Sequence, residues 1–115
     1  MSRYMEIEIR LKAIYGTGGM KAAFPGIARF LESYRYHRVL DEEPSLYYLV
    51  DVLTRLKNDP GVPEHAKRPI ARMEPAIMSL RNEAREALLS RRLNDLDKLL
   101  YRLEDLFEDL DRELG

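Results

Sequence analysis

The sequence predicts an all-α protein of four to five helices in a bundle-like arrangement, ending in a helical hairpin or in one long bent helix with a heptad pattern. Three observations support this fold class. Hydrophobic residues make up 45% and charged residues 34% of the 115 residues, a balance typical of a chain that folds into helices. Apolar residues recur at helical spacing in several segments. The last fifth of the chain carries an unbroken heptad pattern.

The length of the chain fits a single helical domain over residues 1–115. Within it we expect N-terminal helices in residues 1–60, a proline-rich connector in residues 61–75 and a C-terminal helical pair or arm in residues 75–115. The net charge is −1, but the end of the chain is acidic, since residues 93–115 hold three Lys/Arg against eight Asp/Glu. Helical segments of opposite charge can complement one another when they pack side by side.

The first segment, residues 2–15, fits two kinds of secondary structure. Apolar and charged residues alternate from Met5 to Lys12, as they do in a half-buried strand. The segment also forms a narrow helical stripe that includes Tyr4 and Leu11, with oppositely charged residues four positions apart. Because no second strand-like segment is evident, we expect a helix here and keep a strand as the alternative.

Two helices are expected in the middle of the chain, after a short helical turn at residues 20–24. Pro25 suits the first turn of a helix that we expect to continue to about Leu40. Ser45 is a candidate N-cap for the next helix, which should end at the Asn-Asp-Pro-Gly turn that begins at Asn58.

Four prolines lie in the segment from Pro60 to Pro75, and proline removes a backbone donor from a helix interior. We therefore expect short turns in this connector and then a helix that starts near Pro69 or Pro75. That helix should either break near Ser90–Asn94 or change its packing partner there, because its apolar stripe and the C-terminal one are out of register. The charges around this point favour a break, and hence a hairpin.

The C-terminal segment carries a heptad seam of apolar residues with alternating spacings of three and four, which is the pattern of a helix that packs one stripe against another helix. Together with Leu99 and Leu106, which flank it, the seam holds more apolar surface than a helix of this length usually buries against one neighbour, which favours a coiled-coil-like oligomer. The expected oligomer or helix–helix interface is Leu93, Leu96, Leu100, Leu103, Phe107 and Leu110, with Leu114 completing the seam.

An aromatic and basic cluster in residues 34–38 suggests a second kind of surface. Arginines can bind phosphates while a tyrosine stacks on a base, as in nucleic-acid-binding proteins. The alternative interpretation is an amphipathic helix end whose basic residue is favoured by the helix dipole. The candidate phosphate or nucleic-acid contacts are Arg35, Tyr36, His37 and Arg38.

Catalytic and metal-binding signatures are not evident. The chain has no cysteine and two histidines, His37 and His65, and it contains no His-rich metal motif and no recognisable serine-nucleophile motif. The acidic residues near the C-terminus lie on an expected helix, which makes a solvated face more plausible than a calcium loop. We therefore expect no catalytic residue, no metal and no cofactor.

Together these patterns predict a non-enzymatic helical protein–protein interaction or oligomerisation module, such as a small subunit or adaptor of a larger assembly. Its expected partner is a second copy or another helical protein, and the alternative is a nucleic-acid-binding protein. No segment approaches the roughly 18 apolar residues that a membrane span requires. We expect a cytoplasmic protein that does not contact membranes.

Overall fold

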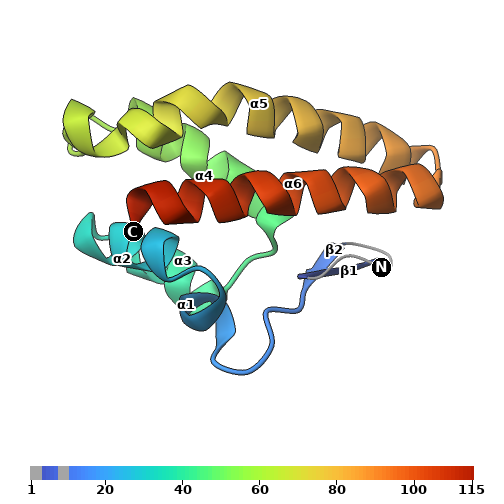
Figure 1. The fold of residues 1–115 in the computed structure, drawn as a ribbon, viewed down its shortest axis with the longest axis horizontal. Coiled ribbons are helices and arrows are strands. Elements are labelled where there is room, and N and C mark those ends of the chain that lie inside the picture. The colour runs from blue at the N-terminus through green and yellow to red at the C-terminus, as the bar shows by residue number, and fades with distance from the viewer. Residues whose placement is uncertain (1–3, 8–10) are drawn as a thin grey trace.

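The computed structural model of the chain describes residues 4–7 and 11–115. In this part of the chain six helices and one antiparallel β-hairpin form a fold dominated by helices, which confirms the all-α prediction (Figure 1). The elements are β1 (Met5–Ile7), β2 (Leu11–Ala13), α1 (Gly19–Ala23), α2 (Pro25–Ser33), α3 (His37–Glu42), α4 (Leu46–Asn58), α5 (Glu64–Leu89) and α6 (Leu93–Leu114).

The arrangement is built on the antiparallel pair of α5 and α6, which contact each other more extensively than any other two elements (Figure 1). Helix α4 packs against α5 and touches α6, while α2 packs against the C-terminal half of α6. The β-hairpin is linked to the middle of α6, where the backbone N–H of Tyr4 donates to the Glu104 carboxylate at 2.9 Å. Helix α6 is therefore contacted by α5, α4, α2 and the β-hairpin.

The C-terminal hairpin predicted from the sequence is confirmed. Helix α5 ends at Leu89 and α6 begins at Leu93, inside the region where a break was expected. Arg91 reverses the chain by adopting a left-handed conformation with a φ of 56°. The N–H of Arg92 donates to the Ala87 carbonyl at 2.8 Å, which satisfies one of the carbonyls at the end of α5.

The preference for a helix in residues 2–15 is wrong in the described part of that segment. Strands β1 and β2 pair antiparallel, with Met5 opposite Ala13 and Ile7 opposite Leu11. The second strand that appeared to be missing from the sequence is the second half of the same segment. Both halves follow the two-residue period of a strand, and this period outweighed the narrow helical stripe. Residues 8–10, between the strands, lie outside the described part of the chain.

The single helix expected from Pro25 to about Leu40 is also wrong, because the structure has two shorter helices there. Helix α2 ends at Ser33, and Arg35 has a positive φ of 66°. The hydroxyl of Tyr36 donates to the Asp59 carboxylate at 2.8 Å, which ties this turn to the end of α4. This break raises the number of helices above the expected four or five.

The proline-rich connector expected in residues 61–75 is wrong from Glu64 onward, because α5 begins at Glu64 and continues through Pro69 and Pro75. A proline in a helix interior costs about 3 kcal/mol. Packing against neighbouring helices offsets this cost, since Ile70 and Ile77 are fully buried.

Two buried polar side chains also fix the first half of α5. The Lys67 ammonium donates to the Asp59 carbonyl at 2.9 Å, and the Thr54 hydroxyl donates to the Glu74 carboxylate at 2.7 Å. Both bonds join α5 to α4 or to the residue that follows α4, so they act together with the apolar contacts to keep the helix continuous across its prolines.

The N-terminus of α2 approaches the C-terminus of α6 very closely. The Ile27 N–H donates to the Asp111 carboxylate at 2.8 Å, and this acceptor satisfies a donor that the start of a helix leaves unpaired. Burial raises the pKa of the Asp111 carboxyl, while the N–H groups of Ile27 and Gly26 act against this rise. A Cβ atom added to Gly26 would lie 2.1 Å from the Asp111 carbonyl oxygen. Only glycine fits at this position without movement of one helix against the other.

We predict that Gly26→Ala lowers the free energy of unfolding by about 1–3 kcal/mol, the usual cost of overpacking. In an open helix the same change stabilises the protein, because alanine has the higher helix propensity. The measurement is urea denaturation followed by circular dichroism. Gly61→Ala is the matched control, because its added Cβ would approach only the side chain of Asp59. A Gly26→Ala protein as stable as the wild type would contradict the close approach of α2 and α6.

Candidate protein-interaction surface

Most of the heptad seam is buried by other helices of the same chain. Five of its residues are fully buried, and α5, α2 and α4 of the same chain contact the helix that carries them. The apolar excess that suggested an oligomer is thus covered by three neighbouring helices instead of one. The five buried residues are Leu96, Leu100, Leu103, Phe107 and Leu110.

The first seam residue behaves differently, because Leu93 lies at the free end of the α5–α6 hairpin. Its side chain is 52% exposed, and that of Leu89, on the other side of the turn, is 68% exposed. Among the described residues these are the two most exposed large apolar side chains. We call Leu89, Leu93 and the intervening residues 90–92 the hairpin tip. Arg91 and Arg92 are also exposed, so the hairpin tip combines apolar and basic groups.

The hairpin tip is exposed because α4 begins too far from it to cover the last turns of α5. Helix α4 begins at Leu46, and its N-terminal half meets α5 around Arg81. The Arg81 guanidinium lies 3.2 Å from the Asp51 carboxylate and 5.6 Å from the centre of the Tyr47 ring. Because α4 starts here, the last turns of α5 extend beyond it, and the hairpin tip lies at the opposite end of the molecule from the C-terminus (Figure 1).

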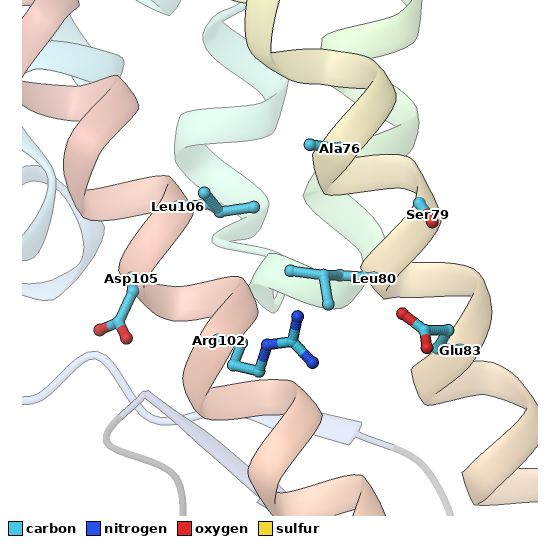
Figure 2. A pocket seen from close by; sticks show the side chains of 7 residues that line it. All are labelled: Ala76, Ser79, Leu80, Glu83, Arg102, Asp105 and Leu106. Atoms are coloured by element: carbon cyan, nitrogen blue, oxygen red, sulfur yellow. The ribbon is translucent and has the colours of Figure 1, made fainter.

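A shallow pocket of about 460 Å³ opens between α5 and α6 (Figure 2). Its apolar part is formed by Leu80 and Leu106, and its charged rim by Glu83, Arg102 and Asp105. Figure 2 shows Arg102 reaching from α6 toward α5, with Asp105 on the other edge of α6. The mixed charges and open shape are typical of a surface between packed helices and suit contact with a protein better than enclosure of a small ligand.

The cluster in residues 34–38 is split by the fold. Tyr36 is half-buried; burial raises the pKa of its phenol, and the hydrogen bond to Asp59 adds to this rise. The N–H of Gly61 and then the Tyr36 hydroxyl hold the pKa of the Asp59 carboxyl below its usual value. Tyr34 packs against Phe30 with ring centres 4.8 Å apart. Neither tyrosine is freely available for stacking on a base.

The three basic residues of this cluster are exposed at the turn between α2 and α3. They are Arg35, His37 and Arg38. Arg38 lies 3.7 Å from Glu42, one helical turn further along the chain. The structure thus retains a small cationic edge but separates it from the aromatic residues that accompany it in the sequence.

Two of the buried carboxylates, Glu74 and Glu104, have structural partners. Glu74 accepts from Thr54 and also lies 3.4 Å from the Lys57 ammonium, and Glu104 accepts from Tyr4. Within residues 4–7 and 11–115 no three histidine, cysteine, aspartate or glutamate side chains are grouped so that they could hold a metal ion. In the same part of the chain, no helix has both the length and the apolar character needed to cross a membrane.

No protein-family model, curated protein or solved structure matches this chain.

Proposed function

We propose that the chain is a non-enzymatic helical protein–protein interaction module, a small subunit or adaptor that binds other proteins through the hairpin tip. The observation that carries this proposal is the exposure of Leu89 and Leu93 on either side of one turn. Burying a leucine side chain is worth roughly 2 kcal/mol. A partner that covers both residues would therefore recover a substantial free energy.

The composition of the hairpin tip supports a specific partner surface. Arginine is enriched in protein interfaces, where its apolar stem packs while its guanidinium forms ion pairs. Arg91 and Arg92 lie between the two leucines in sequence, so the hairpin tip carries two basic groups beside its apolar ones. The surface that best complements this tip is apolar at its centre and acidic at its rim.

We predict that a photo-crosslinking side chain at position 89 captures a discrete protein adduct in cells that make the full chain. The matched control is the same side chain at Lys21, an exposed position on α1. Leu93→Ser should reduce the adduct several-fold, because it removes the second apolar contact. It should change the melting temperature little, since Leu93 is already exposed. Gel electrophoresis and mass spectrometry provide the measurement. Absence of an adduct at position 89, or equal labelling at position 21, would contradict the proposal.

The second candidate is nucleic-acid binding at the cationic edge, which the exposure of Arg35, His37 and Arg38 favours. If it holds, mixed-sequence single-stranded RNA or DNA binds at low salt, the affinity falls steeply as salt rises, and Arg35→Glu with Arg38→Glu abolishes binding. Fluorescence anisotropy provides the measurement. A wild-type protein that binds neither nucleic acid at about 20 mM salt would remove this candidate.

A further inference from the structure

The outer face of α6 carries a row of charged residues that we call the charged stripe. Its members are separated by three, four, three, four and three positions, the same spacing as in the buried seam. At roughly 100° per residue the charged stripe lies about 150° around the helix from the buried residues. All six members are exposed: Asp95, Lys98, Arg102, Asp105, Asp109 and Arg112.

The order of charges in the charged stripe is complementary to its own reverse. From the start of α6 the signs run acidic, basic, basic, acidic, acidic, basic. Read from the other end, they are opposite at every position. A second copy of α6 lying antiparallel would place the partner's Arg112 beside Asp95, the partner's Asp109 beside Lys98 and the partner's Asp105 beside Arg102. A two-fold axis repeats each pair, which is the property of an isologous interface.

Partly apolar side chains border the charged stripe on both sides. Tyr101 and Leu106 flank the charged stripe on opposite sides, and both present apolar surface, with Tyr101 36% exposed and Leu106 half-buried. In an antiparallel two-fold pair each edge of the interface holds the same flank of both helices, so Tyr101 lies on one edge with the partner's Tyr101, and Leu106 lies on the other edge with the partner's Leu106.

We propose that the charged stripe of α6 binds the charged stripe of a second copy of this chain, antiparallel and about a two-fold axis. Two short-range ion pairs made by members of the charged stripe, one of them with Arg92 just before α6, are compatible with this contact. Asp109 contacts Arg112, and Asp95 lies 3.4 Å from Arg92, but both pairs are exposed and compete with water. Because the contacts are mainly exposed ion pairs, the dimer is weak and sensitive to salt.

This inference names a partner for an interaction module, so it extends the proposed function. It uses a different face of the hairpin from the tip, and therefore the two proposals can fail separately. A position-89 adduct with a monomeric chain would leave the proposed function standing without the dimer. A dimer without a position-89 adduct would leave the charged stripe as the association surface.

The test is sedimentation equilibrium of the full chain and of two charge reversals, Arg102→Asp and Asp105→Arg. We expect the wild type to dimerise at about 20 mM salt and its dissociation constant to rise at least about tenfold by about 500 mM salt. Each reversal alone places like charges opposite each other twice in the homodimer. Each variant should therefore be monomeric where the wild type is dimeric.

An equimolar mixture of the two variants provides the decisive arm. In the mixed dimer, one chain carries acidic side chains at both positions 102 and 105, and the other chain carries basic side chains at both, so every pair is again of opposite charge. The mixture should form a heterodimer with an affinity close to that of the wild type. Pairing within one helix cannot explain this result, because each variant helix still carries two like charges at these positions. Arg38→Asp, on α3, is the control that should leave the dissociation constant unchanged.

Three outcomes would overturn the inference: a wild type that stays monomeric at about 20 mM salt and high protein concentration, single variants that dimerise as the wild type does, or a mixture that stays monomeric. Melting temperatures measured on the same samples separate loss of association from loss of folding.

Discussion

The structure depends on one constraint, which is that the apolar face of α6 must be removed from water. Five side chains on that face are fully buried, and each buried leucine or phenylalanine contributes roughly 1.5–3 kcal/mol. One neighbouring helix cannot cover a face of this width. Helix α5 covers it along its length, α4 adds a contact, and α2 covers the C-terminal half, where Gly26 permits a close approach. The positions of the other helices follow from this requirement.

Much of α6 and its hairpin could be predicted from the sequence, because heptad spacing and terminal charges are local signals. The predicted segment Leu93–Leu114 coincides with the observed helix. Features that depend on residues distant in sequence could not be predicted in the same way. The prolines predicted short turns and a helix that starts only near Pro69 or Pro75, but the packing of Ile70 and Ile77 outweighs their local cost. The pairing of β1 with β2 was obscured because one sequence segment contains both strands.

The candidate surfaces also combine features that local sequence predicts with features that depend on residues distant in sequence. The seam predicted an oligomer or helix–helix interface, and in the structure five of its residues are buried by helices of the same chain, which the sequence alone does not reveal. Tyr36 appeared free to stack until the fold placed it beside Asp59, 23 residues away. The exposure of Leu89 and Leu93 depends on where α4 begins relative to α5, which is a property of the tertiary arrangement. The order of charges on α6 can be read from the sequence, but the structure is needed to show which face of the helix is buried and that the charged residues lie on the exposed one. The buried face of α6 serves the fold, and its charged stripe is the face that we propose for pairing with a second copy.

The most direct test of this account is native-state hydrogen exchange of the full chain. If α6 is the helix on which the fold is built, the amides of residues 96–110 should exchange only through global unfolding, with the same free energy as the most protected amides of α5. Amides in the β-hairpin and α1 should exchange through smaller, local openings. Exchange of α6 at a free energy well below that of α4 and α5 would contradict the account, because it would show that the rest of the fold persists without this helix.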